Sequence, residues 1–590
     1  MIAFSIGMPL KIITILLYIS FLNAQASEIS NHPTWLKLLH YNHTYSTVLT
    51  DSFFLSSNGK YDPEAELVAT IKAYSAPWNQ NPNEHARCKF PARYFWLSTQ
   101  LDLPNYKLIE PRCKKLKTWG LFDSVKSISL LLVSGYLGNP ASTFGHSLLK
   151  LNTESDNKQL FDLTINYGAL IPEDESTFLY VMRGLWGGYK AGFSDKYFYT
   201  QDIVYSRTEL RDIWDYKLKL SDYERIFLIL HIWEIVGNKF DYYFLDENCA
   251  YRLAELLNLV IDEELLVKVL LWYVPVELFH RLDHIDKSNN KQLIESVKFI
   301  PSNQRQLYHK LKLLTPEELT AFNTIIRNGN YIDDLKQFST DKKILILSSL
   351  LAYYQYKFTD DQQTQRELKR QILLARLQLP ARSIASVEIP ELPSPADGSL
   401  PMEFGLNFVN STSNFLRLNW SPFKKDLIGS NSLEGDELVI LDLKIDIDKD
   451  KLFLNTVDLI RVMNLNTLPV KIEKENQLSW KLRFGIDRVA NKYDGVASFG
   501  TGYAWQWKKN IISYGMVDFT AHTLSPIIRL YPNFGLRFDL GKTKTWLYIG
   551  TESGTNDTKW GGKMQYQFNK QYAFYATFDE YTSVGLKWYW

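Results

Sequence analysis

One cysteine and one histidine lie in sequence contexts that suit nucleophilic chemistry. Cys249 follows a polar, acidic turn and precedes helically spaced apolar residues such as Leu253 and Leu257, which predicts a place in the first turn of a helix. The N–H groups of a first turn have no partner within the helix, and the positive end of the helix dipole lies there. Both stabilise a thiolate, so the thiol pKa of Cys249 should fall below its free value of about 8.5. His146 lies at the start of a predicted strand that begins near Phe144, after a turn-rich loop. An imidazole beside Cys249 would lower that pKa further and relay the proton to a leaving group.

The same residue types also have ordinary structural roles. A cysteine at a helix start is often a buried small hydrophobic residue, and a histidine in a strand is often a hydrogen-bonded core residue. Asn248 and Tyr243 flank the nucleophile and are candidates for an oxyanion pocket, or equally for packing and turn roles. The glycine-rich residues 184–192 fit a mobile cover over the site, or an ordinary turn-rich loop.

The other cysteines, Cys88 and Cys113, are close in sequence and lie in similar basic contexts, so we expect a structural disulfide between them. Residues 1–26 have the features of a secretory signal, with Lys11, an apolar stretch and an Ala-Gln-Ala cleavage motif. The apolar stretch is shorter than the ~20 residues needed to span a bilayer, and no other such stretch occurs. In an oxidising compartment the unpaired Cys249 is then either inert or chemically used.

Composition excludes several classes of function. The 590 residues are 45% hydrophobic and carry a net charge of +1, so no global field favours nucleic acid or an anionic surface. The sequence has no P-loop, G-x-S-x-G, H-E-x-x-H or C-x-x-C motif, and its ten histidines have no metal-like spacing. We therefore predict no cofactor, no metal and no nucleic-acid partner.

The expected architecture is an α+β multidomain chain. The predicted parts are a signal peptide at 1–26, a disulfide-stapled segment at 27–115, an α/β domain carrying the chemistry at 116–290, a helical region at 291–388, a Pro-rich linker at 389–401 and a β domain at 402–590.

The β domain shows strict alternation of apolar and polar residues. Leu441, Leu443 and Ile445 alternate with charged residues, and the last strand ends on Trp588 and Trp590. Strands near ten residues, aromatic residues at strand ends and an aromatic final strand favour an antiparallel barrel of outer-membrane type with about eight strands. A small soluble barrel with its aromatic residues inside is the alternative.

Several spaced motifs resemble one known family. They are Gly-Asn-Pro-Ala-Ser-Thr-Phe-Gly-His at 138–146, Gly-Gly-Tyr at 187–189, Arg-Asp-Ile-Trp-Asp-Tyr at 211–216, His-Ile-Trp-Glu at 231–234 and Tyr-x-Phe-x-x-x-Asn-Cys at 242–249. Residues 115–285 thereby resemble the domain of unknown function 4105 family, which is also the extracytoplasmic domain of the lipoprotein N-acylating enzyme Lnb. That family is similar to circularly permuted, papain-like NlpC/P60 thiol enzymes, in which histidine precedes cysteine. The resemblance implies Cys249 as nucleophile and His146 as general base.

NlpC/P60-like sites also use a third polar group to orient the imidazole. The strand at 161–167 follows the His146 strand, and a hairpin turning near residues 155–156 would bring residues 164–166 opposite His146. Asn166 is the first choice for this role and Asp162 the second, although either side chain could instead cap a strand.

The favoured function is hydrolysis or transfer of an acyl group through a thioester on Cys249, in the periplasm or outer membrane of a Gram-negative bacterium. The resemblance points to lipid or lipoprotein acyl groups. The C-terminal half departs from Lnb, because it carries β structure and no transmembrane helices, so only the thiol chemistry is carried over. Two alternatives stay open: an amidase or peptidase acting on cell-wall peptide, and a non-catalytic scaffold anchored by the barrel.

Overall fold

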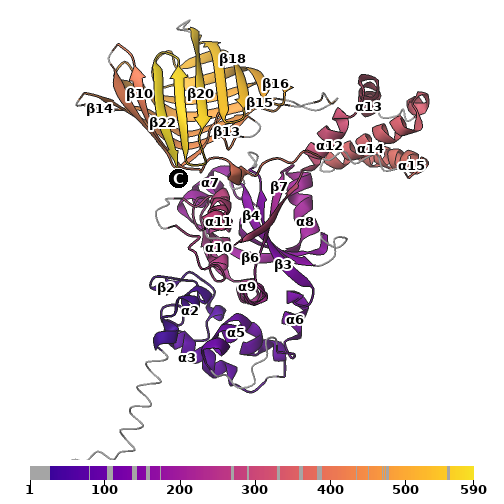
Figure 1. The fold of residues 1–590 in the computed structure, drawn as a ribbon, viewed down its shortest axis with the longest axis vertical. Helices are drawn as coiled ribbons and strands as arrows, with labels where there is room; N and C mark the ends of the chain where they lie inside the picture. Colours follow the sequence, from indigo (N-terminus) through magenta and orange to yellow (C-terminus); the bar gives the residue numbers. More distant parts are fainter. Residues whose placement is uncertain are drawn as a thin grey trace, which may run out of the picture. The chain divides into compact units, whose positions relative to one another are not determined.

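The computed structural model describes residues 27–590, except residues 79, 102–109, 136–142, 154–159, 173, 268–271, 289–291, 329–332, 358–362, 382–388, 413, 433–434, 450, 468–469, 471, 473–477 and 554–557 (Figure 1). The predicted signal peptide and residues 138–142 of the first motif lie outside the described residues. The chain divides into two compact units: Met1–Asp202 with Trp214–Lys298, and Ile203–Ile213 with Phe299–Trp590.

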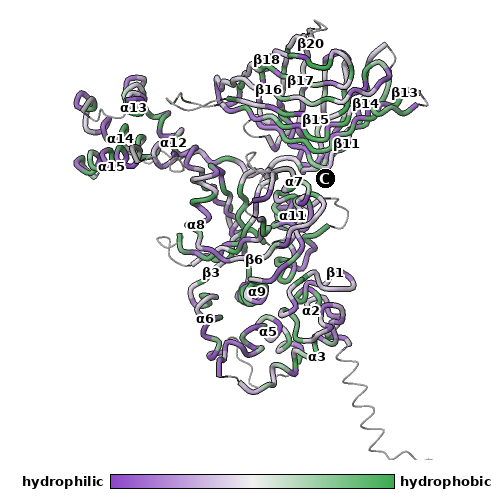
Figure 2. Tube along the Cα trace, turned by 180° about the vertical axis from the view of Figure 1, so that it is seen from behind, coloured by the Kyte–Doolittle hydropathy of each residue, from purple (hydrophilic) through white to green (hydrophobic). Residues whose placement is uncertain are grey.

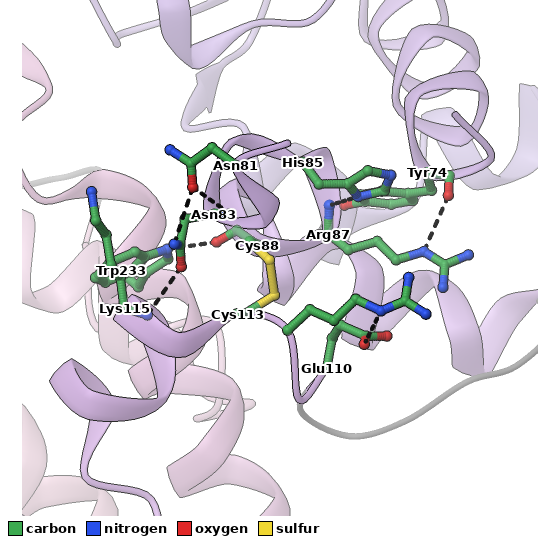
Figure 3. The surroundings of a disulfide bond; sticks show 11 residues. Tyr74, Asn81, Asn83, His85, Arg87, Cys88, Glu110, Cys113, Lys115 and Trp233 are labelled. Atoms are coloured by element: carbon green, nitrogen blue, oxygen red, sulfur yellow. Dashed lines mark hydrogen bonds and ion pairs between the residues drawn. A yellow bond between two sulfur atoms is a disulfide. The ribbon is translucent and has the colours of Figure 1, made fainter. Parts of the chain in front are cut away.

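The first unit begins with a helical assembly held by a disulfide. Its helices are α2 (Pro33–Leu38), α3 (Pro63–Tyr74), α4 (Ala86–Lys89), α5 (Pro91–Gln100) and α6 (Lys114–Gly120), with a short hairpin of β1 (Tyr41–Asn42) and β2 (Tyr45–Ser46). Cys88 and Cys113 are bonded, as predicted from their contexts. Figure 3 shows that the Cys88 carbonyl accepts a hydrogen bond from Trp233 Nε1 at 2.8 Å. The disulfide therefore also fastens this assembly to the helix that carries Trp233.

A seven-stranded sheet forms the centre of the first unit. Its strands are β3 (Val125–Val133), β4 (His146–Thr153), β5 (Leu163–Ala169), β6 (Tyr189–Tyr197), β7 (Ile213–Leu218), β8 (Lys239–Tyr242) and β9 (Ile294–Ile300), in the order β8-β6-β5-β4-β3-β7-β9. The pairs β3–β4, β4–β5, β5–β6 and β6–β8 are antiparallel. Val133 pairs with His146, Ala169 with Ala191 and Tyr189 with Tyr242. One end of the sheet thus holds the start of β4, the end of β5, the start of β6 and the end of β8.

Five helices accompany this sheet. They are α7 (Thr177–Trp186), α8 (Phe198–Asp202), α9 (Asp222–Ile235), α10 (Cys249–Leu257) and α11 (Pro275–Ser288). Ser221 and Glu224 form a capping box that starts α9. Glu234 of α9 accepts hydrogen bonds from the backbone N–H groups of Ala92 and Arg93 at 2.6 and 3.0 Å. The N-terminal helices and the sheet domain therefore share one core.

The second unit contains a helical region and a barrel. The helices are α12 (Asn303–Lys312), α13 (Pro316–Asn328), α14 (Thr340–Tyr356) and α15 (Gln363–Leu377). Buried apolar residues of these helices, among them Phe322 and Leu350, form one hydrophobic cluster. The cluster also includes Ile472. No helix among the described residues is long and apolar enough to cross a membrane.

The C-terminal strands close into an antiparallel barrel, as the alternating pattern predicted. They are β10 (Glu403–Asn410), β11 (Phe415–Ser421), β12 (Phe423–Lys425), β13 (Asp436–Asp448), β14 (Lys451–Asn464), β15 (Ser479–Val489), β16 (Lys492–Lys508), β17 (Ile511–His522), β18 (Ile528–Leu540), β19 (Thr543–Thr551), β20 (Thr558–Gln567), β21 (Tyr572–Phe578) and β22 (Thr582–Tyr589). Pairing of β11 with β13 closes the ring, and β11 and β12 lie one after the other along β13. The barrel therefore has twelve strand positions around its wall, because β11 and β12 together occupy one of them.

The expectation of about eight strands was wrong. Several hairpin turns are very short, so more of the domain lies in strands than expected; the turn between β15 and β16 consists only of Ala490 and Asn491, both with positive φ. Along β17, Val517 and Phe519 are exposed and Met516 and Asp518 are buried. Figure 2 shows the same alternation of hydrophobic and hydrophilic residues along the barrel strands. Large apolar side chains therefore face outward and the charged ones face the lumen.

Candidate active site

Cys249 is the first residue of α10, as its sequence context predicted. The preceding Asn248 is the N-cap residue, and its Oδ1 accepts from the N–H groups of Ala250 and Tyr251 at 3.1 and 3.3 Å. Cys249 lies outside the disulfide and only 3% of its surface is exposed. The thiol is thus placed at the positive end of a well-capped helix.

His146 and Asn166 are hydrogen-bonded. His146 is the first residue of β4, and its Nε2 atom lies 2.6 Å from Oδ1 of Asn166 on β5. An amide oxygen can only accept, so Nε2 carries the proton and donates it. In the neutral imidazole Nδ1 is then the proton acceptor, which is the state a general base needs.

Asp162, the second choice for this role, does not reach His146. Its Oδ1 accepts from the N–H and hydroxyl groups of Thr153, at the end of β4 remote from His146. Burial raises the pKa of Asp162, although its hydrogen bonds to Thr153 lower it. Asp162 therefore ties the β4–β5 hairpin together, as the strand-capping alternative proposed.

The elements that carry these three residues pack together. Helix α10 lies against β4 and β5. Asn248 Nδ2 donates to the carbonyl of Tyr273 at 2.7 Å, and Pro275 Cβ lies 3.8 Å from the position that a Cβ atom on Gly145 would take. Residues 273–275 thus contact the neighbour of Cys249 on one side and the neighbour of His146 on the other. The structure brings the cysteine and histidine motifs to one end of the sheet.

Gly145 fits a conformation that a side chain would disfavour. Its φ is +97°, and a Cβ atom there would lie 3.0 Å from the carbonyl oxygen of Val133. The glycine of the Phe-Gly-His motif therefore lets the chain turn tightly against β3 immediately before His146.

Asn248 does not fit the predicted role in an oxyanion pocket. Both hydrogens of its amide are used, because Nδ2 donates to the carbonyls of Phe244 and Tyr273 at 3.1 and 2.7 Å. The cap also engages the N–H groups of Ala250 and Tyr251, so Asn248 Oδ1 already uses these two backbone donors. The contacts of Asn248 favour the turn role that the sequence left open: it fixes the start of α10.

Tyr243 is half-buried and packs against a glycine turn. A Cβ atom on Gly187 would lie 2.6 Å from Cε1 of Tyr243, so the ring lies directly on the backbone there. Residues 184–192 are the end of α7, a turn of Gly187 and Gly188 and the start of β6, which pairs with β5 and β8. Most of the predicted mobile cover is therefore regular structure, because sheet pairing immobilises the segment after Gly188.

Arg252 of α10, which the sequence analysis did not single out, ties this helix to the segment before it and to the N-terminal part of the chain. Its guanidinium is fully buried and donates to Thr47 at 3.0 Å, to Glu255 at 2.7 Å and to Glu247 at 2.5 Å. Burial opposes ionisation of Glu255, but the Arg252 charge outweighs it and holds the pKa of Glu255 at about 2. The i, i+3 spacing of Arg252 and Glu255 was visible in the sequence, whereas contact with Thr47 was not. The N-terminal segment thus supports the helix that bears Cys249.

Within the described part of the chain, no group of three or more His, Cys, Asp or Glu side chains is arranged to hold a metal ion. The chemistry supported at this end of the sheet is that of a thiol, an imidazole and an amide.

Comparisons with known proteins agree with the motifs. Residues 115–284 match the family model of the Lnb N-terminal periplasmic domain, which supports the Lnb-like part of the resemblance drawn from the motifs. Residues 27–100 match the domain of unknown function DUF7843, and residues 392–587 match the domain of unknown function DUF7840. No curated protein was found to match the sequence.

Two solved structures resemble part of the chain. A KdgM porin is 8% identical, with 32% of this chain and 99% of that chain covered at a TM-score of 0.23. A Rhodopseudomonas blastica porin triple mutant is 11% identical, with 33% and 100% covered at 0.17. The periplasmic-domain match and the closed antiparallel barrel themselves support a place in the envelope of a Gram-negative bacterium.

Proposed function

We propose that the protein is an exported envelope thiol hydrolase or acyltransferase with Cys249 as nucleophile, His146 as general base and Asn166 as positioning residue. The observation that carries the proposal is the hydrogen bond from His146 Nε2 to Asn166 Oδ1. It leaves Nδ1 to accept the thiol proton, while the start of α10 stabilises the thiolate. The match to the Lnb domain supports the same assignment, and a permuted papain-like fold is part of the proposal.

The reaction proceeds through a thioester. The Cys249 thiol gives its proton to His146 Nδ1, and the sulfur attacks the acyl carbonyl carbon. The bond from that carbon to the leaving oxygen or nitrogen breaks, and the leaving group takes the proton back from Nδ1. Water or an amine, deprotonated by the neutral imidazole, then attacks the thioester and releases the thiolate. Asn166 holds Nε2–H throughout and so keeps the ring in one orientation.

Apolar side chains near the site support lipid or lipoprotein acyl groups as substrates. Exposed large apolar residues follow β5 and occupy one side of α7: they are Leu170, Ile171, Leu179, Met182, Leu185 and Trp186. The backbone N–H of Phe244 donates to the carbonyl of Gly184 at 2.7 Å, which joins α7 to the segment leading to Cys249. Exposed apolar clusters of this kind mark binding surfaces. A cell-wall peptide would call for polar side chains there instead.

The barrel is proposed to lie in the outer membrane. Its outward positions carry exposed residues such as Phe499, Phe519 and Phe534, and its inward positions carry buried charges such as Asp458 and Lys587. Only a surrounding bilayer makes an apolar outside and an ionic inside favourable together. The barrel would then anchor the thiol domain to a membrane that contains its acyl substrates.

Trapping the acyl-enzyme tests the activity. The full chain is incubated with a synthetic diacyl lipopeptide, and separately with a muropeptide, and its intact mass is measured with and without hydroxylamine. A hydroxylamine-labile acyl adduct that is lost in Cys249→Ala supports the proposal. Muropeptide cleavage without an acyl adduct would contradict this proposal and favour the cell-wall amidase or peptidase. No reaction with either substrate would favour the non-catalytic scaffold. Because Cys249 is only 3% exposed, we expect covering residues to move when substrate binds.

A further inference from the structure

The connection between β12 and β13 folds into the barrel rather than away from it. In this connection, residues 426–432 are named here the plug segment. Leu427 and Ile428 are 0% and 1% exposed, and Ser432 is fully buried. Leu427 belongs to a hydrophobic cluster made by inward side chains of β14, β16 and β17, including Met463 and Tyr514. A surface turn of seven polar and apolar residues would not bury its backbone in this way.

Contacts with the opposite wall show that the plug segment crosses the lumen. Arg537 of β18 donates to the carbonyls of Leu427 and Ser432 at 2.8 and 2.9 Å. Lys544 of β19 donates to the carbonyls of Gly429 and Ser432 at 2.8 and 2.7 Å. Around the closed wall, five strands separate β18 from the position shared by β11 and β12, in either direction. A segment that leaves β12 and reaches β18 has therefore spanned the full width of the barrel.

The plug segment is also held on the side where the chain enters the barrel. Lys587 of β22 lies 3.5 Å from the carboxylate of Asp426, and the Ser430 hydroxyl accepts from the N–H of Ser399 at 2.8 Å. Arg537 and Lys544 are 2% and 6% exposed, so their charges are satisfied largely by plug carbonyls and by Asp539, at 3.6 and 3.5 Å. Buried cations aimed at backbone oxygens form a clamp that is lost if the segment leaves.

We infer that residues 426–432 are an internal plug that closes the barrel, so that the barrel is a sealed anchor and not a pore. The inference rests on the proposed membrane barrel. Arg537 and Lys544 are the clamp that keeps the plug in place, and removing both should open a path through the lumen.

Conductance of the full chain in planar lipid bilayers tests the plug. We expect the wild type to be silent and the double variant Arg537→Gln/Lys544→Gln to gain ion conductance. The matched control is Lys481→Gln, which removes an inward cation that bonds to Asp518 and Asn533 and does not touch the plug; it should stay silent. Steady conductance by the wild type, or a control that conducts as strongly as a conducting double variant, would overturn the inference.

Crosslinking covers the case in which the double variant is silent or misfolds. In a Cys249→Ser background, Ser432→Cys and Lys544→Cys should be joined across the lumen by a short bis-maleimide in the membrane-inserted protein, detected by mass after proteolysis; a linker is needed because in the wild type the long Lys544 side chain spans the distance between the two backbones. No crosslink in protein that floats with liposomes would mean that the plug is not seated. Failure to float at all would instead count against the membrane barrel, so the two proposals fail in distinguishable ways.

Discussion

The Nε2 atom of His146 lies 2.6 Å from Oδ1 of Asn166, so a neighbouring strand fixes the tautomer of the imidazole. Replacing Asn166 by Ala should leave the ring free to turn while Cys249 stays in place. Hydrogen bonds to a charged partner are worth about 1.5–3 kcal/mol, so kcat/KM should fall by about tenfold to a hundredfold. The measurement is a pH–rate profile with an activated acyl ester. Asn166→Asp, which restores an acceptor, should recover part of the loss and shift the limb of the profile due to His146; a purely structural role would give no such shift.

Glu255 should make the first unit less stable in acid. Its folded pKa of about 2 is below the ordinary value of 4.5, because the Arg252 charge and a hydrogen bond from His40 outweigh burial. The carboxylate therefore contributes stability above pH 4.5 that is lost as the pH falls toward 2. Glu255→Gln should cost at most about 3 kcal/mol at neutral pH, and the gap to wild type should narrow in acid.

Urea unfolding at pH 7 and pH 3 checks this pH dependence. Glu295→Gln is the matched control, because Glu295 pairs with Lys217 on the surface and both side chains are well exposed. It should change the unfolding free energy little at either pH. An equal effect of the two substitutions would show that the Arg252–Glu255 pair contributes no more than a surface pair.

Gly145→Ala should damage the site through the backbone. A positive φ at a non-glycine residue costs about 1–3 kcal/mol, and the new Cβ would press on the Val133 carbonyl at 3.0 Å. We expect a lower Tm and a loss of activity as His146 is displaced. Gly237→Ala is the control, because its φ is +86° but nothing lies within 4 Å of the added atom. Equal losses of Tm would mean that the contact with Val133 is unimportant.

Phe519→Lys should destabilise the barrel in a bilayer. Phe519 is 51% exposed on β17 and faces outward. A lysine at the membrane midplane costs about 2–4 kcal/mol and much less near the interfaces. Tyr581→Lys, in the turn between β21 and β22, is the matched substitution near a barrel end. Urea unfolding in liposomes should show a larger loss of unfolding free energy for Phe519→Lys than for Tyr581→Lys. No loss of unfolding free energy in Phe519→Lys would favour a water-soluble barrel.

The sequence predicted those parts of the fold that local patterns determine. The start of α10 at Cys249, the pairing of β4 with β5, the bond between Cys88 and Cys113 and the alternating barrel strands all follow from spacing and turn residues. The contact between His146 and Asn166 could be anticipated because a hairpin brings neighbouring strands into register.

Other features depend on contacts that are distant in sequence. Asn248 looks like a pocket residue until the carbonyls of Phe244 and Tyr273 converge on its amide. Arg252 has the sequence context of a surface helix residue, and its burial requires Thr47 from the N-terminal segment. The plug segment has an ordinary turn composition, and its contacts with Arg537 and Lys544 of the opposite wall show that it lies inside the barrel.

The most direct test of the thiol site is the rate at which Cys249 reacts with iodoacetamide as a function of pH, in the wild type and in His146→Ala. Cys88 and Cys113 are bonded to each other, so Cys249 is the thiol that reports. We predict that the wild-type rate rises with a midpoint well below the free thiol value of about 8.5 and that His146→Ala moves this midpoint upward and slows the reaction at neutral pH. The same midpoint and rate in both proteins would contradict the account, because Cys249 would then be a buried thiol that does not interact with the histidine.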